Sequence, residues 1–487
     1  MLFTSPIFFL LVIFVLAVWP AVAMRRRARH ALIAAVSLVF YGWWDWRCIA
    51  VLVAVAATSF LTALAMERSG RRNRWLVVDL TVVLGLLVAY KYADFLLANL
   101  AALTGGAWLP GAGGEGKPGF LSLAPIGISF YTFQSLTYTF EVHRGKLPAS
   151  RDPLHYFAFL SFFPQLLAGP INRAALLMPQ LATDRRPTPE DRWAGLKLLL
   201  RGYFMKAVVS DGLAPVINAA FALRDAPDSS VFWWLIVAGY AVQIYADFSG
   251  YTDIARGLAR LLGYEFAVNF NRPYFATSIS EFWTRWHMSL STWLRDYLFM
   301  PTINGILRRV AKLNLATVEQ EMRLAYPAAS LVTMLLCGLW HGAGWTFILW
   351  GGLHAVGMSV EQLTRWPKRL RRLPAGRVMV HAALVLQILV TWVVFRSASL
   401  EQAAGIIARM FAAPPGLDVL KQALGGINAL NLLVLCALGI AADFDPAGRL
   451  RTRAWWPRYG EPLGYALILA AAVVFRGPGA RFIYFQF

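Results

Sequence analysis

The 487 residues are 58% hydrophobic and only 15% charged, whereas soluble globular domains carry about 25% charged residues. With a mean hydropathy of +0.54, this composition argues against a soluble enzyme, a disordered chain and a secreted disulfide scaffold. The net charge of +20 comes from basic clusters directly after apolar segments, so the positive-inside rule explains it better than nucleic-acid binding does. We therefore predict an all-α polytopic membrane protein, with one transmembrane domain over residues 1–487.

Twelve apolar runs are close to the length of about 20 residues that a membrane-spanning helix needs. The predicted spans cover residues 6–24, 31–47, 48–66, 75–100, 123–141, 193–220, 231–248, 327–344, 346–364, 378–396, 427–442 and 461–476. Two other stretches, 155–182 and 265–301, are interrupted, and we predict non-spanning segments there, surrounded by protein or by a water-filled cavity. The second stretch is expected to be helical from Ser280 onward.

The basic clusters predict how the chain crosses the membrane. Residues 25–29, 68–74, 368–377 and 449–453 are expected on the cytoplasmic side, which places both termini outside. No basic residue precedes the first apolar run, so we expect an uncleaved helix there rather than a signal peptide. The three cysteines are far apart and form no CxxC motif, which predicts neither a disulfide framework nor a zinc site.

Ionisable residues within membrane segments are costly, so they mark candidate functional sites. The first such cluster, Tyr245 to Asp253, ends an apolar helix with two carboxylates, Asp247 and Asp253. It suggests a helix end that faces a cavity. A capped helix end with solvated acids uses the same residue types and is an equally good interpretation.

The second cluster, Phe282 to Asp296, surrounds His287 with tryptophans and arginines, which is not a lipid-facing pattern. At helical spacing one face carries Trp283, His287, Leu290 and Leu294, and the neighbouring face carries Trp286, Ser289, Trp293 and Asp296. The alternative is an interfacial aromatic belt with a hydrogen-bonded histidine, and taken alone this cluster fits the belt better.

The third cluster, Cys337 to Trp345, places His341 between glycines in a long apolar stretch. Gly338 and Gly342 form a small-xxx-small pair, which accounts for close helix packing. Packing does not account for an imidazole at membrane depth, because that group must find a partner, and we favour a functional His341. His354 lies off the face of His341 and is interpreted as a packing histidine. The histidines have no spacing typical of a metal site, so none is predicted.

Four motifs follow one another in the second half of the chain: Asp247-Phe-Ser-Gly-Tyr-Thr-Asp253, Asn269-Phe-Asn-Arg-Pro-Tyr274, Phe282 to Asp296, and Gly338-Leu-Trp-His-Gly342. In this order and spacing they resemble the membrane-bound O-acyltransferase (MBOAT) superfamily, and more narrowly its bacterial AlgI-like branch of alginate O-acetylation membrane subunits. The DltB and PatA proteins of cell-wall acylation are near relatives. The resemblance covers most of the chain.

The resemblance implies a ring of about 11–12 transmembrane helices, with re-entrant helices around a central funnel. It implies that His341 is the catalytic histidine and His287 the second motif histidine. The candidate residues of a donor funnel, from this resemblance and the motifs, are Trp286, Ser289, Trp293, Arg295, Asp296, Trp340, Asp247 and Asp253. The segment 302–326 departs from the family pattern, so the resemblance implies no detail of donor docking there.

Acyl transfer from a thioester to a hydroxyl needs a base, and histidine titrates close to working pH. We expect His341 to be the general base and His287 to position it or the thioester carbonyl. Candidate donors to the developing oxyanion are Nε2–H of neutral His287, Trp286 and Arg295. The expected donor substrate is a cytoplasmic acyl thioester, most simply acetyl-CoA, and no bound cofactor is expected.

The expected acceptor is a hydroxyl of an extracytoplasmic polysaccharide or of a periplasmic SGNH-hydrolase-like partner, as the resemblance implies. The expected location is the bacterial inner membrane, with membrane lipid around the protein and no nucleic acid bound. One alternative is transfer of a D-alanyl or longer acyl group within the same superfamily. The other is a transporter or lipid-linked glycan flippase, against which stands the absence of a visible internal repeat.

Overall fold

The computed structural model describes residues 1–105, 125–223, 227–313, 317–416, 418, 426–443, 459–475, 477–480 and 482–483. Within these residues every regular element is a helix and no strand is present, which confirms the predicted all-α class. The contacts divide the chain into two compact units, residues 1–200 with 251–267 and residues 201–250 with 268–487. The single domain over residues 1–487 stays a prediction. The predicted inside cluster at 449–453 lies outside the described residues.

Several helical stretches are long and apolar enough to cross a membrane, namely Cys48–Ser69, Arg72–Thr104, Pro189–Ala222, Ser230–Leu261, Val318–His341 and Gly376–Arg396. The other predicted spans also coincide with helices, among them the shorter apolar helices Pro6–Val22 and Glu461–Val474. Helices of this length and apolarity are what a bilayer requires. The protein is therefore a multi-pass membrane protein, as its composition predicts.

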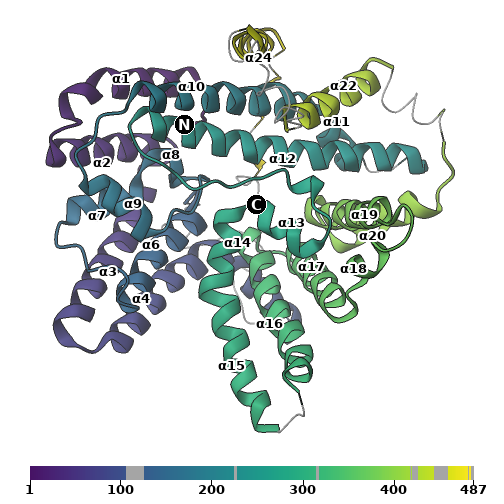
Figure 1. Cartoon of the computed structure of the whole chain (residues 1–487), viewed down its shortest axis with the longest axis horizontal. Coiled ribbons are helices and arrows are strands. Elements are labelled where there is room, and N and C mark those ends of the chain that lie inside the picture. Colours follow the sequence, from purple (N-terminus) through teal and green to yellow (C-terminus); the bar gives the residue numbers. More distant parts are fainter. Residues whose placement is uncertain are drawn as a thin grey trace. The chain divides into compact units, whose positions relative to one another are not determined.

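The first unit consists of helices that follow one another along the chain (Figure 1). They are α1 (Pro6–Val22), α2 (Arg26–Gly42), α3 (Cys48–Ser69), α4 (Arg72–Leu87), the π-helix η1 (Val88–Tyr92), α5 (Ala93–Thr104), α6 (Ile128–His143), α7 (Pro153–Ser161), α8 (Phe163–Leu166), α9 (Ala174–Ala182) and most of α10 (Pro189–Tyr203). The end of α12 (Ser230–Leu261), from residue 251 onward, also belongs to this unit.

Helix α2 begins at Arg26, five residues before the predicted span at 31–47. Arg29, expected in a cytoplasmic cluster, lies in the first turn of this helix and is fully buried. Its guanidinium donates to the carbonyl oxygens of Leu181 and Thr183 at 2.8 and 3.1 Å and pairs with Asp184 at 3.0 Å. A buried arginine is tolerated when its N–H groups find such acceptors. Part of the charge attributed to topology therefore has a structural role.

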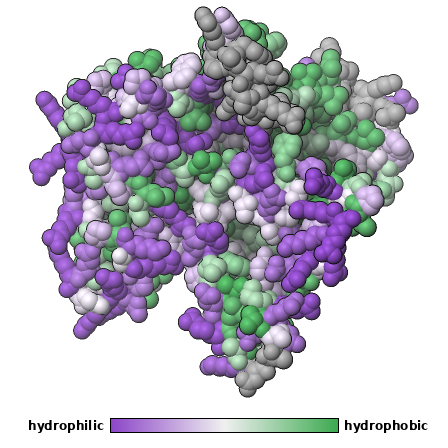
Figure 2. Space-filling view, viewed as in Figure 1, coloured by the Kyte–Doolittle hydropathy of each residue, from purple (hydrophilic) through white to green (hydrophobic). Residues whose placement is uncertain are grey.

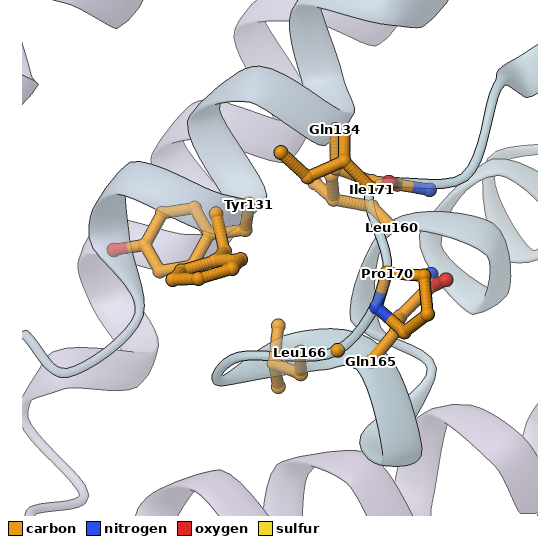
Figure 3. Close-up of a pocket in the computed structure, with 9 residues that line it drawn as sticks. Tyr131, Gln134, Leu160, Gln165, Leu166, Pro170 and Ile171 are labelled. Atoms are coloured by element: carbon orange, nitrogen blue, oxygen red, sulfur yellow. The ribbon is translucent and has the colours of Figure 1, made fainter. Parts of the chain in front are cut away.

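The stretch 155–182 forms the short helices α7, α8 and α9 rather than one span, as predicted. The chain leaves helical geometry at Phe162, where ψ is 110°, immediately before Phe163-Pro164. Gln165 then accepts a hydrogen bond from the Asn172 amide at 2.7 Å. Gln134 of α6, Gln165 and Pro170 line a small cavity of about 10 Å³ (Figure 3), which has room for a single water molecule.

The second unit holds the two histidine motifs. It contains the π-helix η2 (Phe204–Ser210), α11 (Asp211–Ala222), the first part of α12, η3 (Pro273–Phe275), α13 (Ile279–Arg285), α14 (Met288–Leu294), the π-helix η4 (Arg295–Phe299), α15 (Met300–Val310), η5 (Ala311–Leu313), α16 (Val318–His341), α17 (Trp345–Thr364), α18 (Trp366–Leu370), α19 (Gly376–Arg396), α20 (Leu400–Ala412), α22 (Gly426–Asp443) and α24 (Glu461–Val474).

The stretch 265–301 is helical from Ile279, one residue before the predicted start, but it is not one helix. The backbone breaks at Trp286 and His287, and His287 has a left-handed φ of 43°. The break is held by the preceding segment: Met288 N–H donates to the carbonyl of Asn269, and Asn271 N–H to that of Arg285, both at 2.9 Å. The predicted shared face of Trp283 and His287 is therefore wrong, because they lie on opposite sides of a break.

Helices α15 and α16 form an antiparallel hairpin, visible as a pair of adjacent helices in Figure 1. Ile303 of α15 packs on Ala325 and Ala329 of α16, and these three residues are at most 5% exposed. Figure 2 shows hydrophobic residues on the visible face of the hairpin and hydrophilic residues beside them. The hairpin takes up much of residues 302–326, and its second helix, α16, carries His341.

Candidate active site

His341 is the last residue of α16, and its imidazole lies among three aromatic side chains. The ring centroids of Trp340, Trp350 and Phe395 lie 4.9, 5.0 and 5.4 Å from the imidazole centroid, and each ring meets it edge to face. The residue is only 3% exposed. Contacts of this kind add directional energy to apolar burial. They hold the imidazole in one orientation within a mostly apolar environment.

Glycines allow α16 and α17 to touch through their backbones beside His341. A Cβ atom at Gly338 would lie 2.1 Å from the carbonyl oxygen of Phe347, and one at Gly351 would lie 2.0 Å from that of Met334. A Cβ at Gly342 would overlap the Phe347 ring at 2.2 Å. Only glycine fits where a backbone or ring approaches so closely. The predicted packing role of Gly338 and Gly342 is confirmed, and this packing fixes the helix end that carries His341.

Asn269 determines which nitrogen of His287 carries the proton. The Asn269 Oδ1 atom accepts the backbone N–H and the hydroxyl of Ser289 at 3.1 and 2.9 Å. His287 Nδ1 lies 3.1 Å from the same oxygen, so Nδ1 is the donor. His287 is outside the candidate spans, and its complete burial lowers the pKa of the imidazole to about 3. The ring is therefore neutral, with Nε2 as the acceptor nitrogen, which disfavours His287 Nε2–H as an oxyanion donor.

Trp340 contacts both motif histidines. Its ring centroid lies 5.9 Å from that of His287 and 4.9 Å from that of His341. Phe248 meets the other histidine, His287, edge to face at 4.5 Å. The structure thus brings His287, Trp340 and His341 together in one aromatic cluster, although the histidines are 54 residues apart in the sequence.

Two members of this cluster, Trp350 and His354, were not among the predicted site residues. They lie four residues apart on α17, and Trp350 contacts both His341 and His354, at 5.0 and 4.9 Å between ring centroids. Trp283 Nε1–H donates to His354 Nδ1 at 3.3 Å, in agreement with the predicted packing role of His354. The available signal was the i,i+4 spacing of a tryptophan and a histidine directly after the His341 motif.

Asp247 belongs to a buried ion cluster. Lys206 Nζ lies 2.7 Å from an Asp247 oxygen and 2.8 Å from an Asp211 oxygen, and all three side chains are at most 7% exposed. The other Asp247 oxygen accepts the backbone N–H of Ile483 at 2.7 Å, and Lys206 also donates to the Ala480 carbonyl at 3.1 Å. Helix α12 continues to Leu261, so the prediction that Asp247 lies at a helix end is wrong. This carboxylate instead ties Ile483 to the middle of α12.

The other predicted funnel residues have varied positions. Trp286 is buried and stacks on Phe282, Ser289 bonds to Asn269, Trp293 packs on Tyr297, and Asp253 pairs with Arg256 at 3.4 Å within the first unit. Arg295 and Asp296 pair with each other at 2.8 Å, with side-chain exposures of 62% and 36%. Tight burial of Trp286 and Trp293 indicates packing roles, whereas Arg295 is accessible.

A cavity of about 390 Å³, here called the apolar cavity, lies among α13, α14, α16 and α17. Its lining residues are Ser280, Trp283, Thr284, Met288, Ser291, Thr292, Leu294, Arg295, Phe299, Tyr326, Ser330, Thr333, Met334 and Met358. Met288 directly follows His287, and Met334 lies about two turns before His341 on α16. The volume and apolar lining suit an organic ligand with few polar groups. Of the predicted funnel residues, Arg295 lines this cavity.

In the described part of the chain, no three His, Cys, Asp or Glu side chains form a group that could hold a metal ion. What the site does offer is two buried imidazoles, each with aromatic neighbours, and a neighbouring cavity that can admit a substrate. A neutral imidazole can accept a proton from a hydroxyl. The arrangement therefore fits proton transfer during reaction of an organic substrate within a membrane protein.

Comparison with protein families agrees with this chemistry. Residues 128–400 match the model of MBOAT, the membrane-bound O-acyltransferase family, and this range covers more than half of the chain. The chain belongs to the membrane-bound O-acyltransferase family. It is therefore an O-acyltransferase, and this assignment replaces the alternative interpretation as a transporter or flippase.

Curated relatives include enzymes of several acylation systems. The chain is 38% identical over 394 residues to the probable alginate O-acetylase AlgI of Azotobacter vinelandii, covering 79% of this chain and 73% of that protein. It is 30% identical to the peptidoglycan O-acetyltransferase of Helicobacter pylori, over 84% of this chain and 75% of the relative. It is also 30% identical to the teichoic acid D-alanyltransferase of Bacillus subtilis, over 54% of this chain and 65% of the relative.

The bond to Asn269 predicts a difference between two substitutions of His287. His287→Asn keeps a side-chain N–H for Asn269 Oδ1 and tolerates the left-handed backbone, so we expect partial acyl transfer. His287→Leu has neither property, and we expect transfer to be lost. Initial rates are measured in membranes and divided by the amount of folded protein. Equal and complete loss in both variants, with normal folding, would contradict a positioning role and indicate direct proton transfer by His287.

Proposed function

We propose that this enzyme moves an acetyl group from a cytoplasmic thioester, most simply acetyl-CoA, to an acceptor on the other side of the bacterial inner membrane. The acceptor is a hydroxyl of a polysaccharide, or of a periplasmic SGNH-hydrolase-like partner that completes the transfer. The observation that carries the proposal is the likeness to O-acetylases over about four fifths of the chain. Likeness to a D-alanyltransferase covers only 54% of it, so D-alanyl transfer is the second candidate.

His341 acts as the general base in this proposal. Its imidazole accepts the proton of the acceptor hydroxyl while the hydroxyl oxygen attacks the thioester carbonyl carbon. The carbon–sulfur bond then breaks, and the leaving thiolate takes up a proton. The surrounding rings of Trp340, Trp350 and Phe395 support this role because they exclude water and fix the imidazole.

The apolar cavity is the proposed route of the donor's acyl-bearing arm. It lies between α14, which follows His287, and α16, which ends at His341. Arg295 is the predicted funnel residue that lines it, and its exposed guanidinium is available to a polar group of the donor or to the oxyanion. His287 positions the cluster through Phe248 and Trp340 rather than by donating from Nε2.

Transfer across the membrane requires a defined orientation, and single-cysteine labelling tests it. In a background without Cys48, Cys337 and Cys436, Ser69→Cys and Ala375→Cys should be protected from a membrane-impermeant reagent in intact cells, whereas Gln486→Cys should react. Residues 69 and 375 are exposed, so permeabilised cells should label both and serve as the control. Outside labelling at Ser69→Cys or Ala375→Cys, or protection at Gln486→Cys, would contradict the proposed orientation.

The function itself is tested with inverted membrane vesicles, which expose the cytoplasmic face. Acetyl-CoA and acetylated or D-alanylated carrier protein are offered separately, and thiol release and acyl groups on the acceptor are measured. The proposal expects acetyl esters on the acceptor. Transfer of D-alanyl groups alone would favour the second candidate, and no ester from any donor would refute both.

A further inference from the structure

A second, polar cavity lies between α13, α17 and α18, with a volume of about 550 Å³. It is here called the basic pocket, because Arg365, Lys368 and Arg371 line it together with Glu281 and Glu361. None of the motifs described above includes these three cations. Lys368 and Arg371 belong to the stretch 368–377 that the charge pattern places on the cytoplasmic side, and Arg365 lies three residues before it.

The two carboxylates of the basic pocket are already engaged by the protein. Glu361 Oε2 accepts the backbone N–H of Ile279 at 2.7 Å. Glu281 accepts the backbone N–H and the hydroxyl of Thr277 at 2.8 and 2.7 Å and pairs with Arg285 at 2.6 Å. These donors fix the position of both carboxylates, and Arg285, which is not among the lining residues of the pocket, balances the charge of Glu281. The pocket is therefore lined by three cations and two carboxylates, one of which is paired with a cation outside the pocket, so positive charge is in excess.

The three cations differ in how firmly the protein holds them. The Arg371 guanidinium donates to the carbonyl and the hydroxyl of Thr277, which fixes it at the start of α13. Arg365 lies 3.5 Å from Glu319, but both side chains are more than 60% exposed, so this pair is weak. Lys368 lies one helical turn after Arg365, on α18. The pocket therefore presents one anchored and two adaptable cations to a ligand.

Two helices, α13 and α17, contribute residues to both the basic pocket and the apolar cavity. Helix α13 lines the apolar cavity with Ser280 and Trp283 and the basic pocket with Glu281. On α17, Met358 lines the apolar cavity, and Glu361, one turn further along, lines the basic pocket. A ligand that fills both has a polyanionic head at the cytoplasmic end and a neutral, flexible arm that reaches toward the histidine motifs.

We propose that the basic pocket binds the phosphate groups of a coenzyme A thioester, with Arg365, Lys368 and Arg371 as ligands of the phosphates and the pantetheine arm in the apolar cavity. This inference rests on the proposed acyl-thioester donor and names its chemical class. Guanidinium and ammonium groups are the side chains that bind phosphate most strongly. A carrier-protein donor exposes one phosphodiester beside a protein surface, and a pocket with three cations exceeds that need.

The test separates the nucleotide from the rest of the donor. Inverted membrane vesicles that contain the full-length protein are supplied with acetyl-CoA or with S-acetyl-pantetheine, which lacks the nucleotide, and thiol release gives KM for each. Lys368→Glu and Arg365→Glu should raise KM for acetyl-CoA by about 10- to 100-fold, the range expected for losing a hydrogen bond to a charged group. KM for S-acetyl-pantetheine should not change. Arg372→Glu carries the same charge change at an exposed position outside the pocket and is the matched control.

Each contrary result has a distinct meaning. An unchanged KM for acetyl-CoA in both pocket variants would overturn the phosphate site. An equal rise of KM in the Arg372→Glu control would also overturn it. In either case, acyl transfer from S-acetyl-pantetheine would still support the proposed function. Turnover with an acetylated carrier protein but not with acetyl-CoA would also overturn the phosphate site. In vesicles made without anionic lipid, loss of the variants' effect would assign the pocket to lipid headgroups instead. Wild-type protein that releases no thiol from any donor would refute the proposed function itself.

Discussion

Replacing His341 with alanine should abolish acyl transfer, with product close to background. General acid–base catalysis contributes about 100- to 10,000-fold, and the imidazole at this position is the proposed base. The substitution also leaves a space among Trp340, Trp350 and Phe395, so His341→Gln, which fills more of that space, is tested beside it. Acetyl esters formed per folded protein are measured in membranes.

His354→Gln is the matched control for this experiment, because His354 is as buried as His341 and also contacts Trp350 in the same aromatic cluster. We expect it to retain most of the wild-type rate. Retention of more than about a tenth of the wild-type rate by both His341 variants would remove His341 from the role of base. Equal losses at His341 and His354 would attribute the effect to packing of the cluster.

Replacing Lys206 with methionine should be the most destabilising single change. Lys206 pairs with Asp211 and Asp247 at 2.8 and 2.7 Å, and methionine would leave both carboxylates buried without their cation. Removing one partner of a buried ion pair costs about 3–5 kcal/mol. We expect a large fall in the yield and thermal midpoint of the purified protein, measured in detergent by size-exclusion chromatography and intrinsic fluorescence.

Neutralising the two carboxylates that pair with Lys206 should restore stability to the Lys206→Met variant. The triple variant Lys206→Met, Asp211→Asn, Asp247→Asn removes both uncompensated charges, so it should recover much of the lost stability. Lys312→Met, at an exposed position in η5, should change the thermal midpoint little. A wild-type midpoint for Lys206→Met would show that the two carboxylates do not depend on this cation.

The helices and their class follow from hydropathy because apolar runs of about 20 residues have few alternatives in a bilayer. The break at His287 does not follow in the same way. Residues 279–294 have helical spacing throughout, but Asn269, eighteen residues before His287, bonds to Ser289 and supplies its carbonyl to Met288. A contact from a distant segment thus outweighs a local preference.

In the candidate site, too, contacts between distant segments could not be predicted from the sequence. His341 could be predicted because an imidazole in a long apolar stretch is costly, and His287 because tryptophans and arginines surround it in a recognisable motif. Trp350 was not predicted, because its spacing to His354 identifies a helix face but does not show that His341 packs against that face. Asp247 was assigned to a funnel on its own motif, whereas its partners Lys206 and Ile483 lie 41 residues before it and 236 residues after it. Pairings over such separations are properties of the fold, not of a motif.

The backbone contact between α16 and α17 limits how this enzyme can move. With Gly338 against Phe347 and Gly351 against Met334, the two helices have no side-chain layer along which to slide, so they are expected to shift as one body. Opening a path to His341 is therefore expected to come from α14 and η4, which line the apolar cavity together with α16 and α17. The rates of donor entry and product release would then depend on how easily the π-helical turn η4, which joins α14 to α15, changes its conformation.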